Sequence, residues 1–191
     1  MLAHGDVSGA MQEYSRLAAL GSGRARCIMA YGYLVGSTLT PRDLVVAKSF
    51  ALSATASEPG FSNYILGFIA LADGNYTSSF ANFLASRKAG FLPAFSASAQ
   101  LFSDLYHSAE RDLRLSENLF KRAIRVGHTP AYMLLAVFYM RGNRGLIKRV
   151  AGIALYPIAL IAFYFAWRFS IFSISTFTYH PTYRNLLKEP R

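Results

Sequence analysis

The stretch GSGRARCIMAYGYLVG, residues 21–36, decides the fold, because it returns as GHTPAYMLLAVFYMRG at residues 127–142. Six positions agree at identical offsets: Gly21 with Gly127, Ala25 with Ala131, Met29 with Leu135, Ala30 with Ala136, Tyr33 with Tyr139, and Gly36 with Gly142. Shorter copies pair Gly60 with Tyr64 and Gly90 with Ala94 at the same spacing. A pattern that recurs about every 30 to 40 residues is typical of helical-repeat proteins.

The physical reading of each copy is a helical hairpin. The first glycine ends one helix, because glycine enters the left-handed conformation without steric cost. The small residue four positions later lies in the first turn of the next helix and lets two helices approach, and the tyrosine and second glycine close that helix. Candidate helix starts are Thr40 with Pro41 and Asp43, Thr77, Pro93, Ser116 and Pro130.

These signals predict an all-α chain with eight helices over the repeats and no strands. The expected ranges are about 6–20, 23–35, 41–57, 61–73, 78–89, 93–108, 116–126 and 130–141. A divergent helical bundle with accidental glycine spacings is the alternative, and six shared offsets argue against it.

Residues 6–142 resemble the Sel1-like repeat, a relative of the tetratricopeptide repeat. The resemblance rests on Gly21, Ala25, Tyr33 and Gly36, followed by Leu39, Asp43, Ala47, Phe50 and Ala54. The second copy is shorter, with Gly74 one position early, and the third shows Phe102 and Leu105 in place of tyrosine and glycine. The resemblance implies a short right-handed α-solenoid of about four repeats, which binds other proteins and has no catalysis of its own.

The C-terminal part is different in character, because 18 residues from Val150 to Trp167 carry no charge. As a helix this stretch is roughly 27 Å long, close to the thickness of a bilayer core. We therefore expect a repeat domain at 1–142, a basic linker at 143–149, one membrane helix within 150–177 and a short basic tail at 178–191. A full span is favoured over a re-entrant hairpin bent at Pro157 and over a core helix of the solenoid. The second apolar stretch, Phe169 to Phe177, either extends a tilted span or lies in the interface.

The charge distribution supports a lipid contact. Acidic and basic residues balance up to Glu110, so the net charge of +10 lies entirely in residues 111–191. Basic residues that flank an apolar span indicate headgroup contact rather than nucleic acid. The expected headgroup residues are Arg141, Arg144, Lys148, Arg149, Trp167 and Arg168. The N-terminus shows no secretory signal, so we expect the repeats on the cytoplasmic side, at a bacterial inner membrane.

No catalytic, cofactor or metal site is apparent in the sequence. The four histidines and the single cysteine lack ligand spacing. We expect Cys27 to lie in a helix seam, His128 in a solvated loop, and Glu110 and Asp112 on a solvated face.

The expected function is therefore a non-catalytic, membrane-anchored adaptor that binds a protein, with an integral membrane protein as partner. Candidate contact residues are Tyr31, Tyr64, Phe68 and Tyr132. Family analogy suggests an accessory subunit of a membrane complex, for example in envelope or polysaccharide synthesis. The alternatives are a membrane-surface enzyme with an unrecognised site and a basic module that binds lipid or nucleic acid. Because helix 6–20 resembles half a hairpin, a partner is also expected at that edge.

Overall fold

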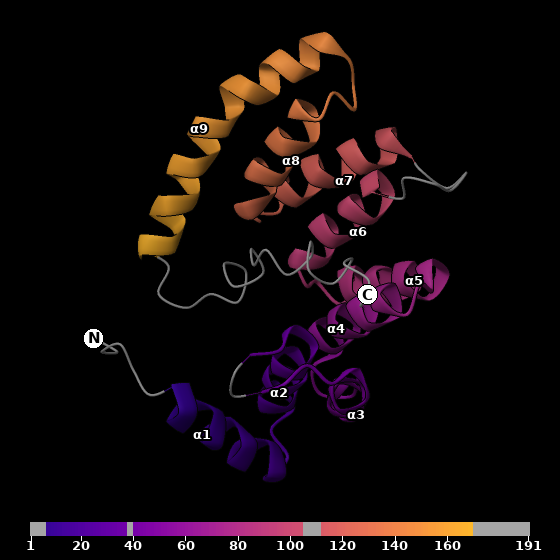
Figure 1. Cartoon of the computed structure of the whole chain (residues 1–191), viewed down its shortest axis with the longest axis vertical. Coiled ribbons are helices and arrows are strands. Elements are labelled where there is room, and N and C mark those ends of the chain that lie inside the picture. The colour runs from indigo at the N-terminus through magenta and orange to yellow at the C-terminus, as the bar shows by residue number, and fades with distance from the viewer. Residues whose placement is uncertain (1–6, 38–39, 105–111, 170–191) are drawn as a thin grey trace. The chain divides into compact units, whose positions relative to one another are not determined.

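The computed structural model describes residues 7–37, 40–104 and 112–169, and all regular secondary structure in those residues is helical (Figure 1). The helices are α1 Val7–Ala19, α2 Gly23–Val35, α3 Leu44–Ala54, α4 Pro59–Ala72, α5 Tyr76–Lys88, α6 Pro93–Asp104, α7 Leu113–Arg125, α8 Pro130–Met140 and α9 Leu146–Phe169. The prediction of an all-α chain is confirmed, and the eight expected repeat helices are present with ends shifted by at most a few residues.

The helices form two compact units: α1–α5, up to Phe91, and α6–α9, from Leu92. We call these the N-terminal and the C-terminal unit. Within each unit one packing rule holds. Consecutive helices pair as hairpins, α2 with α3, α4 with α5, α6 with α7 and α8 with α9. The second helix of a hairpin also contacts the first helix of the next, as α3 does with α4 and α7 with α8.

Helix α1 packs on α2 in the same way as α3 packs on α4. Its side chains join a small core around Ala18, Ala25 and Met29, which the rings of Tyr33 and Phe50 border. Those two rings stack with 6.0 Å between their centroids. Helix α1 thus occupies the place of a second hairpin helix, as the sequence pattern predicts.

The first glycine of a repeat copy ends three of the helices where the sequence predicts it. Gly21, Gly90 and Gly127 have φ of 95°, 79° and 89°. At each, the glycine N–H donates to the carbonyl three residues back and the next N–H donates to the carbonyl five residues back. This is the Schellman termination, in which only glycine avoids a steric penalty. The same bonds end α4 at Gly74, where φ is 72°.

Gly60 differs from this pattern, and the prediction that it ends a helix is wrong. It lies in the first turn of α4, while α3 ends earlier, at Ala54. A Cβ on Gly60 would lie 3.0 Å from the Cβ of Phe91. This position therefore favours glycine because another part of the chain comes close.

Three predicted caps are also displaced. The observed N-caps of α3, α5 and α7 are Asp43, Asn75 and Asp112, whose side chains accept backbone N–H groups. Asp43 belongs to the predicted helix start at residues 40–43, whereas Thr40, Thr77 and Ser116 do not serve as the caps of these helices. Ser116 is buried and donates to the carbonyl of Ala99 across the hairpin. A carboxylate or amide that accepts N–H bonds satisfies a helix start better than threonine.

The largest difference concerns the C-terminal segment. We expected a linker at 143–149 and a membrane helix within 150–177. Helix α9 instead begins at Leu146 and pairs with α8 as the second helix of the fourth hairpin (Figure 1). In the part of the chain that the structure describes, no helix is both long and apolar enough to cross a bilayer. Residues 170–191, which include the predicted tail, lie outside the described residues.

Gly127 allows a direct test of the repeat termination. Nothing lies within 4 Å of a Cβ built on it, so a substitution there changes only backbone strain. We expect Gly127→Ala to lower the free energy of unfolding by about 1 kcal/mol. Gly127→Asn should lower the free energy of unfolding by less, because asparagine tolerates the left-handed conformation. Urea denaturation of both variants measures the difference, and equal stability of wild type and Gly127→Ala would contradict the assignment.

Candidate interaction surface on helix α9

Helix α9 contacts α8 through a narrow seam of small residues. Gly152 and Ala159, seven residues apart, are buried there. A Cβ on Gly152 would lie 2.7 Å from the Cβ of Tyr139, 2.8 Å from the carbonyl oxygen of Ala136 and 2.9 Å from the nitrogen of Met140. The two backbones therefore approach closely, which only glycine permits at this position.

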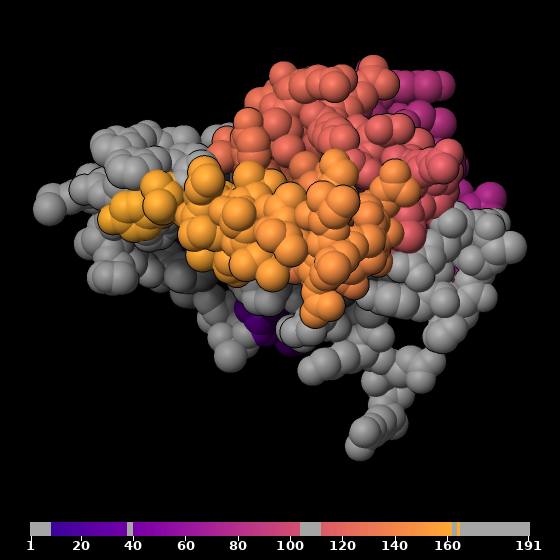
Figure 2. All heavy atoms as spheres, turned by 90° about the horizontal axis from the view of Figure 1, so that it is seen from above, coloured from indigo at the N-terminus to yellow at the C-terminus, as the bar shows by residue number. Residues whose placement is uncertain are grey.

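Many of the described side chains of α9 outside this seam are apolar and exposed. Ile147 is 87% exposed and Ile158 is 63% exposed, values that are unusual for such side chains. The exposed apolar face also includes Leu146, Val150, Ile153, Leu160, Ile161 and Tyr164. Figure 2 shows the described part of α9, in orange and yellow, lying uncovered on the face toward the viewer. No charged residue occurs from Val150 to Ile161. A contiguous apolar face of this kind marks a contact with another molecule or with lipid.

A buried carboxylate organises the basic end of this surface. Glu117 of α7 is 5% exposed and accepts hydrogen bonds from the Tyr139 hydroxyl, at 2.7 Å, and from Arg144 Nε, at 2.7 Å. Its Oε1 also lies 2.7 Å from Lys121 Nζ and 3.6 Å from Lys148 Nζ. The cluster joins α7, α8, the following turn and the first turn of α9. We call it the Glu117 cluster.

Three hydrogen-bond donors determine the charge state of Glu117. Burial by itself raises the pKa of the Glu117 carboxyl, but hydrogen bonds from Lys121, Tyr139 and Arg144 outweigh it and lower the pKa to about 2. The carboxylate is therefore ionised at neutral pH. Burial and the hydrogen bond to Glu117 raise the pKa of Tyr139, which stays a donor. Lys148 Nζ also lies 5.1 Å from the centre of the Tyr139 ring.

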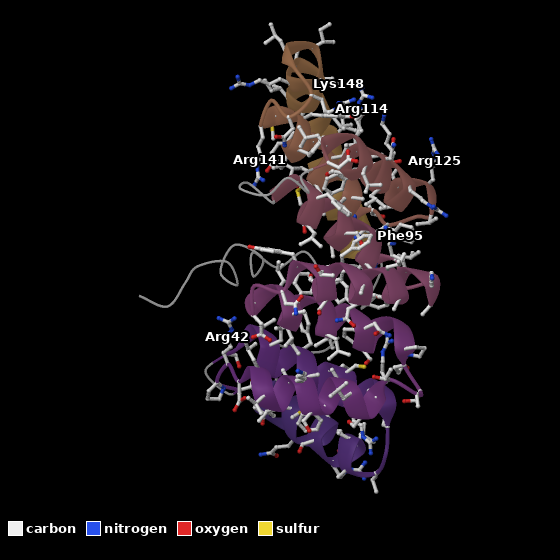
Figure 3. All side chains as sticks on the ribbon, turned by 90° about the vertical axis from the view of Figure 1, so that its right-hand side faces the viewer. Arg42, Phe95, Arg114, Arg125, Arg141 and Lys148 are labelled. Atoms are coloured by element: carbon white, nitrogen blue, oxygen red, sulfur yellow. The ribbon has the colours of Figure 1, made fainter. Side chains whose placement is uncertain are left out.

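The predicted headgroup residues are only partly brought together. Arg144 and Lys148 belong to the Glu117 cluster, and Arg149 is exposed on α9. Arg141 is exposed at the C-cap of α8 and is labelled in Figure 3. The side chains of Trp167 and Arg168 lie outside the described residues.

Two of the four predicted partner contacts are core residues. Tyr64 and Phe68 are buried, and their rings pack edge to face with centroids 4.9 Å apart. Both rings also pack on Phe83. Tyr31 is half-buried, and Tyr132 remains on the surface. The expectation fails for Tyr64 and Phe68 because α5 and the turn at Phe91 cover them.

Two residues with reactive side chains are buried. Cys27 lies in the helix seam as expected, and burial raises the pKa of its thiol to about 12. His128 was expected in a solvated loop, but it is 1% exposed, its Nδ1 has no hydrogen-bond partner, and burial lowers its pKa to about 4. Among the residues that the structure describes, no group of three or more His, Cys, Asp or Glu side chains is arranged to hold a metal ion.

The sequence by itself does not single out Glu117. The spacing of Glu117 and Lys121 is that of an ion pair on one helix, which normally indicates an exposed pair of little consequence. Only the hairpin that follows brings Tyr139, Arg144 and Lys148 onto the same carboxylate.

No family model matches the chain, and a search of the curated proteins finds no match. The fold is that of an all-α helical-repeat protein. Among solved structures it is similar to the crystal structure of a protective antigen present in uropathogenic Escherichia coli strains, which displays a Sel1-like repeat (SLR) fold. The TM-score is 0.54 and the sequence identity 15%, and the match covers 96% of this chain and 42% of that one. The chain thus spans about two fifths of that protein's length, and the likeness concerns the fold.

Gly152 tests the close approach of α8 and α9. The atoms that a new Cβ would meet belong to backbone or to a Cβ and have no freedom to turn aside. We expect Gly152→Ala to lower the free energy of unfolding by about 1–3 kcal/mol and to increase amide exchange in α9. Ala154→Met, which adds bulk at an exposed position of the same helix, is the control. Unchanged exchange in Gly152→Ala would refute the packing.

His128 makes a pH dependence measurable. The imidazole takes up a proton near pH 6.5 in the unfolded chain but near pH 4 in the folded chain, so stability is full above 6.5 and falls as the pH drops toward 4. Between about pH 7.5 and about pH 5, above the range where Glu117 titrates, we expect a loss of roughly 2 kcal/mol. His128→Asn should remove that loss in urea denaturation, and an identical pH dependence in wild type and variant would disprove the assignment.

Proposed function

We propose that the chain is a non-catalytic helical-repeat adaptor that attaches to the surface of an anionic membrane through helix α9. The observation that carries this proposal is the exposed apolar face of α9, with basic side chains at its N-terminal end. Residues 141–149 include four basic residues and no acidic one. Apolar side chains that enter the acyl region and cations at headgroup level are the two attractions used by interfacial helices.

The packing of α9 favours attachment over a full span. The seam at Gly152 and Ala159 is occupied by α8, so lipid surrounds at most the opposite side of the helix. In an ordinary interfacial helix the polar side faces water. In this chain the side of α9 that would face water packs on α8 instead. Eight exposed apolar side chains, each contributing on the order of 1 kcal/mol when buried, are sufficient for reversible binding.

The repeat fold supports the adaptor part of the proposal, because stacked helical hairpins present extended surfaces for protein partners. A partner that is itself a membrane protein fits this attachment. We accordingly place the repeats on the cytoplasmic side of a bacterial inner membrane, as an accessory part of a larger complex, with envelope or polysaccharide synthesis as the setting by family analogy.

The experiment is vesicle flotation of the purified chain. Ile153→Asp with Ile161→Asp places two charges on the exposed face of α9 without touching the core. We expect this double variant to lose vesicle binding by at least about tenfold. The matched control is Val45→Asp with Leu52→Asp, which changes two exposed apolar residues of α3 and should bind as wild type does.

Circular dichroism of both double variants confirms that they fold. If wild type fails to float with anionic vesicles, or if both double variants lose binding equally, membrane attachment through α9 is refuted.

A further inference from the structure

Three cations of the C-terminal unit converge on one carboxylate. Lys121 of α7, Arg144 of the turn and Lys148 of α9 all contact Glu117. The carboxylate is buried, whereas the three cationic side chains keep between a third and a half of their surface exposed. Glu117 therefore holds the three cationic groups in place on the protein side, while part of each cationic side chain remains exposed to solvent.

The charge of this cluster is not balanced. Glu117 supplies one negative charge against three positive ones, and both lysine ammonium groups contact the same oxygen, Oε1. Asp112, the N-cap of the same helix, is occupied by the N–H groups of Arg114 and Leu115. Like charges held this close repel one another, so a second anion would stabilise the arrangement. The cluster carries an excess of two positive charges.

We propose that Lys121, Arg144 and Lys148 form a binding site for a phosphate monoester, and that the ligand is the headgroup of a lipid of the phosphatidic acid type. A phosphate monoester carries a charge of about −1.5 to −2 at neutral pH, which matches the excess, whereas a phosphodiester carries a single charge. Arg144 uses Nε for Glu117, so its terminal nitrogens remain as donors for a phosphate oxygen.

The position of the site points to lipid. Lys148 lies in the first turn of α9, next to the exposed residues Ile147 and Arg149, and its side chain is directed toward Glu117 and Tyr139. Arg144 and Lys148 thus lie at the end of α9 where the exposed apolar face begins. This inference rests on the proposed function, because α9 brings the site to the membrane. Glu117 acts as the positioning residue, which fixes the cations before the ligand arrives.

The first measurement compares vesicles of equal surface charge that contain phosphatidic acid or phosphatidylglycerol. We expect wild type to bind the phosphatidic acid vesicles about tenfold more strongly, and Lys121→Met to lose that preference. Lys121 is on α7, outside the apolar face of α9. Arg125→Met removes the same charge from the exposed C-terminal end of α7, away from the cluster, and should retain the preference; Figure 3 labels Arg125 and, at the other end of α7, Arg114.

The second measurement needs no membrane. Inorganic phosphate at constant ionic strength should raise the Tm of wild type and of Arg125→Met, and should leave the Tm of Lys121→Met unchanged. The comparison uses the phosphate-dependent change in Tm, so a general loss of stability in the variant does not affect it. Arg144→Met repeats the test at a second cation.

The outcomes separate the two proposals. If phosphate raises the Tm but wild type shows no preference for phosphatidic acid, the lipid is not the ligand. If neither effect is seen, the phosphate site is overturned and the cluster is a structural group of ion pairs. If no vesicle of either kind binds wild type, the proposed membrane attachment fails, and the Tm measurement still decides the phosphate site.

Discussion

Helices α8 and α9 come so close at Gly152 that a methyl group there would lie 2.7 Å from the Cβ of Tyr139. This contact has two consequences for the C-terminal unit. It holds a long apolar helix against the repeats through backbone proximity rather than through large interlocking side chains. It also leaves eight large apolar side chains in the described part of α9 exposed. The surface that carries the proposed function thus lies beside a contact that is made through small residues.

The Glu117 cluster acts on the same hairpin from its other end. A buried carboxylate without partners would destabilise the fold, and removal of one partner from a buried ion pair typically costs several kcal/mol. Here donors from α7, from α8 and from the turn before α9 satisfy it together. The first turn of α9 is therefore tied to the repeats electrostatically, while Gly152 and Ala159 tie its middle by close packing. The excess positive charge that remains is available to a ligand.

Small residues serve two separate purposes in this chain, and the sequence pattern does not distinguish them. At Gly21, Gly90 and Gly127 glycine is required by a positive φ. At Gly60 and Gly152 it is required by the approach of another segment. The spacing of Gly60 in the sequence does not tell which requirement applies, which explains why Gly60 was expected to end a helix and instead lies inside one.

The sequence alone determined the helical hairpins, because helix starts, glycine terminations and small contact residues are local signals written within a few neighbouring positions. Eight helices and the half-hairpin at α1 follow from them. The place of residues 146–169 in the fold was decided only by the tertiary structure, since the uncharged stretch from Val150 to Trp167 suits a membrane and a solenoid contact equally well until α8 is placed beside it. The same holds for the burial of Tyr64, Phe68 and His128 and for the cations gathered on Glu117. Burial and charge clustering depend on residues that are distant in the chain, and such residues come into contact only when the hairpins stack.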